Sequence, residues 1–467
     1  NELRIRKTRI KLGDAKLKKI VLFWLTLCLL VGQSMNANLT LYKNGYTMVK
    51  QPAFWNISKG QSQITYSLVP NQLFPETPFL SLMNGVEIMS QRLNRNIFSS
   101  DSYFKSRIGN MVEAYPEGEK SVYGQLIEFN SKSITIQSKS WVKMIPRDEL
   151  TILAIKEKVE DVQFRPKLEW DIKANHSGHI NGDILYMTGG IEWKSVYRLI
   201  TSPNEESAKL VSEALIFNDT DLNFEESRLK LIEGDLHKTS SHRPILYGPK
   251  MTQSMRTQDE SLTQQKMEEA PLGDYYVYSI EKNVSLMPGE IVTLTLYSPR
   301  DISFKKTYIF ENRERQKKEE PLTVELEIAN TEENNLSIPL PAGKVEIYLE
   351  TSEGNIEFIG EDNIRQIPKG EKAKLIAGKA FDIIGKRKIV NYDRQRKSEE
   401  ASIEVEILNK KDQSAQVKII EHISGDWVIK DSNKQWIKED AATIYFPLTI
   451  PPGESDIILY TYKKEWK

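Results

Sequence analysis

The chain has 467 residues, of which 39% are hydrophobic and 28% charged, and its formal net charge is −1 at pH 7. A chain of this length and composition is globular and divides into about two to four domains. Residues 1–37 contain eight Lys or Arg against Glu2 and Asp14, a net charge of +6, so the body carries −7. A mildly acidic body has no electrostatic footprint for nucleic acid, and no nucleic-acid partner is predicted.

The N-terminal stretch has the pattern of a secretory signal. The basic start is followed by "IVLFWLTLCLLV" at 20–31 and then by "GQSMNA", which ends in the small residue Ala37. The apolar run is much shorter than the roughly 20 residues that a spanning helix needs. We predict a signal peptide over 1–37, cleaved after Ala37. An uncleaved anchor is the alternative, and membrane contact is expected only through this segment.

The number and position of the cysteines limit which reactive or metal sites the protein can have and which cell compartment it fits. The single cysteine, Cys28, lies inside the apolar run and is lost with the signal. The exported body then has no disulfide, no thiolate nucleophile and no zinc thiolate site, and no cofactor is predicted. A large secreted chain without cysteine is typical of the bacterial envelope. We expect the protein in the periplasm, on the outer-membrane surface or outside the cell.

The body shows a hydrophobic period of two almost throughout. In "LTVELEI" (322–328), "KVEIYLE" (344–350) and "SIEVEIL" (402–408), apolar residues alternate with polar ones. This alternation predicts half-buried strands. The predicted fold is all-β, with serial antiparallel β-sandwich domains of immunoglobulin-like type and a small SH3-like barrel insertion after the N-terminal signal helix.

Glycines are closely spaced in 340–388, as in "LPAGKVEIYLETSEGNIEFIGEDNIRQIPKGEKAKLIAGKAFDIIGKRK". They fall between alternating runs and are accompanied by Pro, Asn and Asp, which is typical of hairpin turns. A phosphate-binding loop needs a following helix, whereas "GKAFDIIGKRK" has the pattern of a strand. Hairpin turns are therefore favoured over a phosphate cradle.

Composition shifts divide the body into three blocks. Residues 38–160 form an N-terminal β domain with the SH3-like barrel near 104–155. Residues 161–315 form a middle β-sandwich interrupted by 237–273, a polar stretch predicted to be a mobile loop. The charged run "ENRERQKKEE" marks the start of a C-terminal sandwich, 316–467. Its core from 321 onward is predicted to include the inward side chains of Val324, Leu326, Val345, Ile347, Val405 and Ile407.

Several long stretches resemble a known bacterial family. "PLPAGKVEIY", "FIGEDNIRQIPKGEKAKLIAGKAFDI", "EVEILNKK", "ISGDWVI" and "IPPGESDIILYTYKKEW" are similar to the domain of unknown function shared with mucoidy-inhibitor-A-like proteins. Upstream, "LYMTGGIEWKSVYRLI", "LIFNDTDLNFEESRLKLIEGD" and "LGDYYVYSI" resemble the longer members, although a central coiled coil is missing here. The resemblance implies a β-rich secreted or periplasmic protein and carries over no catalytic residues.

Two groups of residues have partial metal-site patterns. His176 and His179 in "NHSGHINGD" form a spaced pair but lie in a Gly/Asn-rich loop without a cysteine partner. Asp219, Asp221 and Asn223 begin like a calcium loop, but Phe224 and Lys230 stand where an EF-hand requires Gly and Glu. Solvated turns are favoured at both places, and no metal site is assigned. The other histidines are expected to be in the mobile insert (His237 and His242) or in a strand (His422).

The remaining candidates are carboxylates and tryptophans. Glu361 and Asp362 are adjacent in sequence, so their side chains are expected to diverge. In a glycosidase the two catalytic carboxylates lie about 5–10 Å from each other and both face the glycosidic bond that is cleaved. G-x-S-x-G, H-E-x-x-H and Walker motifs are absent from the sequence. Trp427 is expected in the core, whereas Trp436 and Trp466 have polar neighbours and are candidates for sugar stacking or partner contacts.

The sequence assigns no catalytic, cofactor or metal residue. The first hypothesis is a non-catalytic envelope protein used for assembly, adhesion or partner binding. The alternative is a carbohydrate-binding or hydrolytic protein acting on envelope polysaccharide, prompted by the tryptophans and the many acidic residues. The expected partner is accordingly an envelope protein or a polysaccharide.

Overall fold

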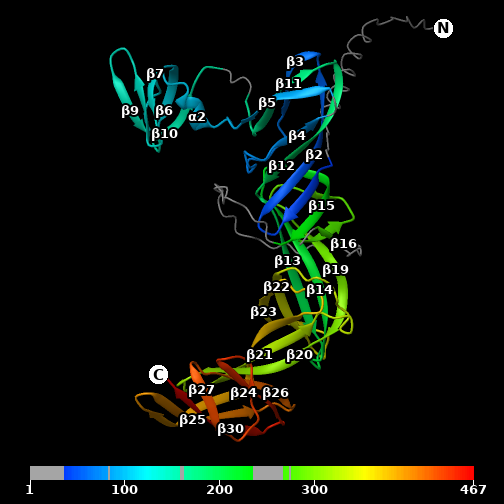
Figure 1. Cartoon of the computed structure of the whole chain (residues 1–467). Coiled ribbons are helices and arrows are strands. Elements are labelled where there is room, and N and C mark those ends of the chain that lie inside the picture. Colours follow the sequence, from blue (N-terminus) through cyan, green and yellow to red (C-terminus); the bar gives the residue numbers. More distant parts are fainter. Residues whose placement is uncertain (1–35, 83–84, 158–161, 235–266, 273–274, 467) are drawn as a thin grey trace, which may run out of the picture. The chain divides into compact units, whose positions relative to one another are not determined.

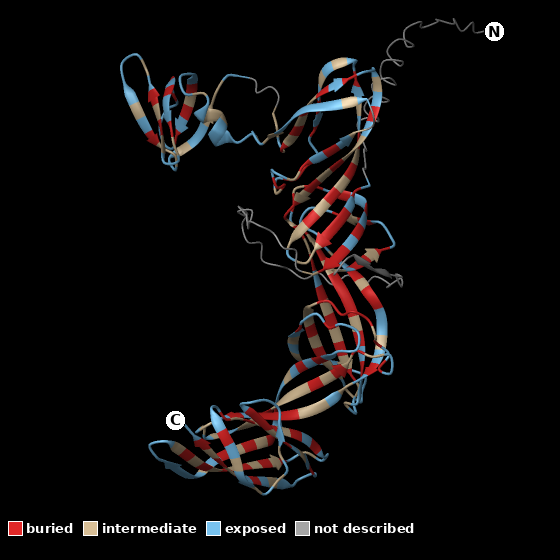
Figure 2. Cartoon of the chain, viewed as in Figure 1, coloured by how far each residue is buried: buried red, intermediate tan, exposed pale blue. Residues whose placement is uncertain are grey.

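The computed structural model describes residues 36–82, 85–157, 162–234, 267–272 and 275–466 (Figure 1). Strands dominate these residues, and the helix α2 (Ser100–Lys105) is short. Buried and exposed residues alternate along the strands, as Figure 2 shows, because successive side chains point to opposite faces of a sheet. The predicted all-β, sandwich-type fold is confirmed. Residues 1–35, with most of the predicted signal segment, lie outside the described residues.

The chain forms two compact units that interleave along the sequence. Unit 1 consists mainly of Met48–Gly190 and Asp219–Ser227, and unit 2 of Leu39–Thr47, Ile191–Asn218 and Arg228–Lys467. The sequence predicts three consecutive blocks with boundaries at 160 and 315 instead. The difference arises because strands distant in sequence share sheets, which alternation alone does not reveal.

Unit 1 contains a three-stranded antiparallel sheet in the order β3-β11-β5, made of β3 (Gly60–Tyr66), β11 (Lys167–Ala174) and β5 (Val86–Asn94). A further antiparallel pair joins β4 (Phe79–Leu82) to β12 (Gly178–Thr188). Trp170 of β11 is fully buried, and its indole Nε1 donates to Gln91 Oε1 at 2.7 Å. This hydrogen bond satisfies the polar atom of a large core side chain.

A separate five-stranded antiparallel sheet closes over its own core within unit 1. Its order is β10-β6-β7-β8-β9, so the last strand of a meander returns to pair with the first. The strands are β6 (Met111–Pro116), β7 (Val122–Phe129), β8 (Ser133–Gln137), β9 (Val142–Pro146) and β10 (Leu150–Ala154). Leu126, Ile134 and Ile136 are fully buried in its core, and Phe104 of α2 stacks on Phe129. This arrangement is the SH3-like barrel expected near 104–155.

The barrel is inserted between two strands that pair with each other. β5 and β11 are antiparallel neighbours, with Asn94 opposite Lys167 at the end from which the barrel leaves. Beyond this end, the Phe98 N–H donates to the Gln163 carbonyl at 2.7 Å, and Gln163 Nε2 donates to the Asn94 carbonyl at 3.0 Å. The two linkers of the barrel therefore leave unit 1's three-stranded sheet side by side.

The first part of unit 2 is a five-stranded sheet in the order β19-β14-β13-β22-β23. Its strands are β13 (Ile191–Thr201), β14 (Ser207–Asn218), β19 (Ile291–Ser303), β22 (Gly343–Glu350) and β23 (Ile356–Ile364). β22 runs parallel to β13, and in the next sheet β20 (Lys305–Arg313) runs parallel to β26 (Ala415–His422). The other strand pairs of these two sheets are antiparallel.

Part of the predicted mobile insert is a strand. β16 (Met267–Leu272) pairs antiparallel with β17 (Tyr275–Ile280), which pairs with the end of β15 (Phe224–Glu233). The short β18 (Val284–Leu286) also joins β15. The loop prediction for 237–273 is wrong at 267–272, because a polar strand at a sheet edge lacks the apolar alternation that would reveal it. Residues 237–266 and 273 lie outside the described residues.

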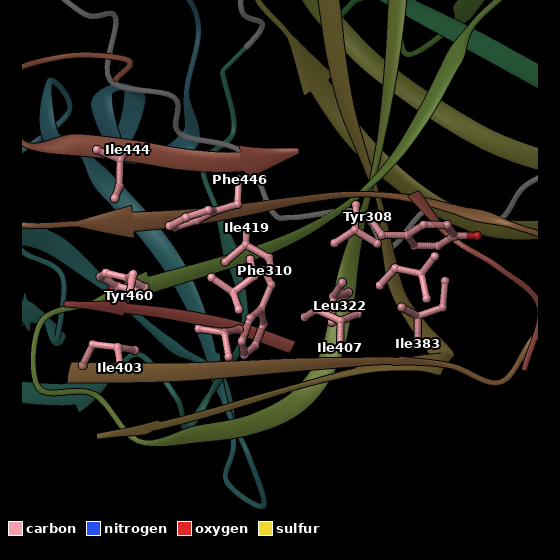
Figure 3. Close-up of a cluster of buried hydrophobic side chains, with 14 of the residues drawn as sticks. Tyr308, Phe310, Leu322, Ile383, Ile403, Ile407, Ile419, Ile444, Phe446 and Tyr460 are labelled. Atoms are coloured by element: carbon pink, nitrogen blue, oxygen red, sulfur yellow. The ribbon is translucent and has the colours of Figure 1, made fainter. Parts of the chain in front are cut away.

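The C-terminal part of unit 2 is a nine-stranded sheet in the order β27-β30-β25-β24-β21-β20-β26-β29-β28. Residues from both ends of this order fill one core, in which Ile403 of β25 and Tyr460 of β30 face Phe446 of β29 (Figure 3). The sheet therefore folds over on itself as a sandwich. Its strands are β20 (Lys305–Arg313), β21 (Lys318–Ala329), β24 (Lys372–Arg394), β25 (Ser398–Asn409), β26 (Ala415–His422), β27 (Asp426–Ser432), β28 (Ile437–Lys438), β29 (Thr443–Ile450) and β30 (Ser455–Glu465).

The predicted core set of the C-terminal block divides between two sheets. Val405 and Ile407 are fully buried in the nine-stranded sandwich, and Val324 packs against it. Val345 and Ile347 are also buried, but they lie on β22 in the other sheet, beside β13. The expectation of one shared core is therefore wrong for these two residues, because alternation identifies the buried face of a strand but not its neighbours.

The glycines of 340–388 serve two structural purposes. Gly354 has a φ of +83° and lies in the tight turn between β22 and β23, as predicted. Gly385 instead lies inside β24, where an added Cβ would come within 2.7 Å of the Phe310 ring. Gly385 allows β24 to approach that ring closely, so the turn reading is wrong at this position.

Candidate functional site

The histidines do not form a shared site. His176 and His179 are both exposed, and His176 Nδ1 lies 2.7 Å from the side chain of its neighbour Asn175. His422 contacts Glu311 at 2.7 Å and Thr443 at 3.1 Å, so its strand neighbours account for it. Within the described ranges, no three His, Cys, Asp or Glu side chains gather as a metal-binding group. His237 and His242 lie outside the described residues.

The acidic turn at 219–223 is bound by protein groups. Asp221 accepts hydrogen bonds from the backbone and side chain of Asn71 at 3.1 and 3.2 Å, and it pairs with Arg165 at 3.4 Å. The Asp219 carbonyl accepts a hydrogen bond from Gln72, and Asn223 donates to Glu225. These contacts fasten the turn to neighbouring loops of the protein.

Glu361 and Asp362 diverge, as expected for adjacent strand residues. Glu361 pairs with Lys344 at 2.9 Å. The Asp362 carboxylate accepts hydrogen bonds from the backbone N–H groups of Asn363 and Ile376. Each carboxylate thus has its own protein partners, and the two do not face a common space.

The tryptophans have packing roles. Trp427 is buried, as predicted, and its Nε1 donates to the Ala441 carbonyl at 2.8 Å. Trp436 is half-buried against the Trp427 ring in an edge-on contact at 6.4 Å, so it offers less free ring surface than its polar neighbours in sequence indicate. Trp466 is 38% exposed, and its Nε1 donates to the Arg396 carbonyl at 3.1 Å.

A buried polar cluster contains a serine beside a lysine. Lys43 Nζ donates to Ser195 Oγ at 2.8 Å, lies 3.4 Å from Glu233 and sits 3.9 Å from the centre of the Trp193 ring. Burial lowers the pKa of Lys43, and the charge of Glu233 opposes this shift. A Ser–Lys pair resembles a nucleophile with its base. Ser195 is only 2% exposed, however, so its hydroxyl is not open to a substrate.

The outer face of the barrel carries an open hollow. A hollow of about 500 Å³, here called the barrel groove, is lined by Gly109, Asn110, Met111, Glu113, Tyr123, Ala154, Ile155, Lys156 and Glu157. Strand register explains its floor, because Ala154 of β10, Glu113 of β6 and Tyr123 of β7 lie directly opposite one another across three adjacent strands. Side chains opposite each other on one face have Cβ atoms about 5 Å apart.

Apolar side chains surround this floor and point to solvent. Met111 is 46% exposed, Tyr123 55% and Ile152 52%. Tyr115, two residues after Glu113 on β6, lies opposite Ile152 of β10 and is also exposed. The inner face of the same strands is complete as a core, so these outer side chains have no role in closing the barrel. Large apolar residues clustered on a solvent face are typical of binding surfaces.

Charged groups around the groove make hydrogen bonds and ring contacts with neighbouring side chains. Arg107 donates two hydrogen bonds to Glu157, at 3.1 and 3.0 Å, and packs over the Tyr103 ring. The bond to Glu157 raises the pKa of Arg107. A hydrogen bond with Glu113 raises the pKa of the Tyr115 hydroxyl. The groove thus combines the Tyr123 ring, the Glu113 carboxylate and the exposed side chain of Lys156, with Tyr115 beside it.

Sequence reasoning located the barrel but not the groove. "MVEAYP" and "VYGQLIEF" alternate like the other strands, which accounts for their inner faces. The available signal was that Met111, Tyr115 and Tyr123 stand at the positions where alternation expects polar residues. Such residues are uninformative singly and become informative only when strand register brings them together.

Comparison of the chain with protein-family models found no match, and comparison with curated proteins found none. In the part of the chain that the structure describes, no helix is long and apolar enough to cross a membrane.

Proposed function

We propose that this chain is a non-catalytic, exported protein of the bacterial envelope that holds a partner protein at the outer face of its inserted barrel. The observation that carries the proposal is the barrel groove, with Met111, Tyr115, Tyr123 and Ile152 exposed around a 500 Å³ hollow. Aromatic residues and methionine are enriched at protein interfaces. The residues that line the groove include no serine, threonine, cysteine or histidine.

Sequence features support the location. The signal pattern of 1–37 and the lack of cysteine from residue 38 onward fit export into an oxidising compartment without disulfides. The resemblance to mucoidy-inhibitor-A-like proteins points to the same compartment and likewise implies no catalytic residues.

Envelope polysaccharide is the second candidate for the same groove. Tyr123 offers a ring on which a sugar can stack, and Asn110 and Glu113 offer hydrogen-bonding groups beside it. A protein partner is favoured because the apolar surface extends beyond the hollow to Tyr115 and Ile152, which is more than one sugar ring needs.

Selection of displayed random 12-residue peptides on the immobilised full chain tests the proposal. We expect the selection to enrich peptides that bind the wild-type protein. These peptides should bind the Met111→Ser variant at least ten-fold more weakly. The matched control is Met144→Ser on β9, an exposed methionine separated from β7 by β8. No enrichment, or equal loss with both variants, would refute a protein-binding groove. Binding on a glycan array that Tyr123→Ala abolishes would favour the polysaccharide.

A further inference from the structure

Glu113 occupies an unusual place for a carboxylate. It is half-buried in the middle of the floor of the barrel groove, directly opposite Tyr123, with Ala154 on its other side. Tyr115 follows two residues later on the same face of β6, opposite Ile152 of β10. The Glu113 carboxylate thus lies beside two tyrosines, Tyr123 across the strand pair and Tyr115 two residues along its own strand.

Three cations of the barrel are paired with carboxylates other than Glu113. Arg107 is bound to Glu157, Lys143 to Glu119 and Arg147 to Asp101. Lys156 lines the groove and is exposed, so it stands where it can meet an acidic group of a ligand. Of the two carboxylates that line the groove, Glu157 is bound to Arg107, which leaves Glu113 as the one that can meet a positive charge of a ligand.

Tyrosine rings and a carboxylate attract a cation for related reasons. The face of an aromatic ring carries negative electrostatic potential, which favours a cation within about 6 Å of its centre. A carboxylate adds a charge-assisted hydrogen bond. The methylene stem of lysine or arginine also needs apolar surface, which Met111 and Ala154 supply here.

We propose that the barrel groove binds a lysine or arginine side chain presented by an extended segment of the partner protein, with the cation between Tyr115, Tyr123 and Glu113. This inference rests on the proposed function and names the chemistry of its partner. A volume of about 500 Å³ accommodates one such side chain together with flanking residues. A charged group at the centre of an apolar contact gives specificity, because a partner without the cation leaves Glu113 desolvated and unpaired.

The test uses fluorescence anisotropy of the full chain with labelled peptides of one alternating valine–serine sequence. The peptides differ only at the central residue, which is arginine, its neutral analogue citrulline, lysine, its neutral analogue norleucine, or glutamate. Arginine and lysine peptides should bind at least ten-fold more tightly than their neutral analogues, and the glutamate peptide should bind most weakly. The preference should decline as salt is raised.

Two variants connect this preference to the groove. Glu113→Gln should bring charged and neutral peptides to within about two-fold of each other, and Tyr123→Leu should weaken the charged peptides selectively. Glu149→Gln, which removes an exposed carboxylate from the turn between β9 and β10, should leave the preference intact. Circular dichroism melts should show that all three variants remain folded.

Failure of this inference is separable from failure of the proposed function. If the selected 12-residue peptides depend on Met111 but citrulline and norleucine bind as well as arginine and lysine, the cation site is wrong and the docking face stands. If Glu113→Gln retains the full preference, the cation binds elsewhere and the inference is also wrong. If no peptide of either kind binds, both proposals fail.

Discussion

The Arg387 guanidinium and the Glu421 carboxylate face each other inside the C-terminal sandwich, with Nη2 2.9 Å from Oε2 and both side chains 1% exposed. The Tyr460 hydroxyl donates to the same carboxylate at 2.6 Å, and Asn312 Nδ2 donates to it at 3.0 Å. The charge of Glu421 raises the pKa of Arg387 in spite of burial, which by itself lowers it. The pair is a fully desolvated ion pair within a hydrogen-bonded network.

Removing one member of this pair should destabilise the sandwich strongly. Arg387→Met leaves Glu421 buried without its cation, and the expected loss is about 3–5 kcal/mol. Arg387→Met combined with Glu421→Met should restore most of the lost melting temperature, because an apolar pair needs no charge compensation. Differential scanning calorimetry of the full chain measures both variants. The control is Lys388→Met on the same strand, which breaks an exposed bridge to Glu404 and should leave the melting temperature nearly unchanged. A double variant as unstable as the single one would contradict this account.

The inserted barrel should be removable. Replacing residues 96–164 by a short Asn-Gly turn should leave the β5–β11 pairing intact, because its register already ends with Asn94 opposite Lys167. The shortened protein should be soluble and should keep Trp170 in a buried environment, as measured by its fluorescence. Conversely, a fragment spanning 99–157 contains the barrel core and should melt cooperatively by itself. Aggregation of both products would mean that the barrel and the rest of unit 1 depend on each other for folding.

Stability should decline at alkaline pH. Burial raises the pKa of Tyr186, Tyr197 and Tyr460 well above the ordinary value of 10.0. Above pH 10 the folded state therefore keeps phenol protons that the unfolded state releases. The contribution of these three tyrosines to the free energy of unfolding is fully present below about pH 10 and is lost progressively above it. Tyr186→Phe should be less stable than the wild type at pH 7, where it loses the hydrogen bond to Gln51. This difference should shrink by pH 11.

Lys43 contributes with the opposite sign. The pKa of Lys43 is lowered, mainly by burial. Between this lowered pKa and the ordinary value of 10.5, the unfolded state binds more protons than the folded state. Stability from this group rises with pH in that window. Melting curves of the wild type and Lys43→Met between pH 8 and 11 separate the two effects. A wild type whose stability continues to rise from pH 10 to 11 would contradict the dominance of the tyrosines.

Adjacent substitutions on β22 should differ in severity. Ile347 is fully buried, so Ile347→Asp should cost several kcal/mol through an unpaired carboxylate in the core. Glu346 is half-buried between Lys344 at 3.0 Å and Arg198 at 3.6 Å, so Glu346→Lys brings three cations together and should lower the melting temperature moderately. Glu346→Gln removes the attraction to Lys344 and Arg198 without adding a positive charge. Its melting temperature should therefore lie between those of the wild type and Glu346→Lys. Equal damage from Ile347→Asp and Glu346→Lys would contradict the assignment of faces.

The export prediction is checked on the native protein. Signal cleavage after Ala37 gives a mature chain that begins at Asn38, which is also the first residue of β1 (Asn38–Tyr42). Amino-terminal sequencing of protein purified from the envelope fraction should therefore begin at Asn38 or close to it. Recovery of intact residues 1–37 on a cytoplasmic protein would refute the prediction.

Alternation predicted the strands well and their partners poorly. Ile347 and Val405 both stand at apolar positions of an alternating stretch, and both are buried. Ile347 lies on β22, which pairs in parallel with β13 about 150 residues earlier in the chain, whereas Val405 lies in the C-terminal sandwich. Long-range pairing depends on the shape and twist of whole sheets, which a window of a few residues does not contain. The barrel groove escaped prediction for the same reason, because Glu113 and Tyr123 meet only through register.

The placement of the barrel in a loop between paired strands determines how mechanical load enters unit 1. A force applied to the barrel would act through both linkers, which reach the sheet at the same end, at Asn94 and Lys167. Tension there opens the β5–β11 ladder one rung at a time from that end, whereas a pull along the strands would strain all rungs together. The attachment therefore yields gradually under force, and the pairs from Leu93–Leu168 inward set the tension at which it begins to give way.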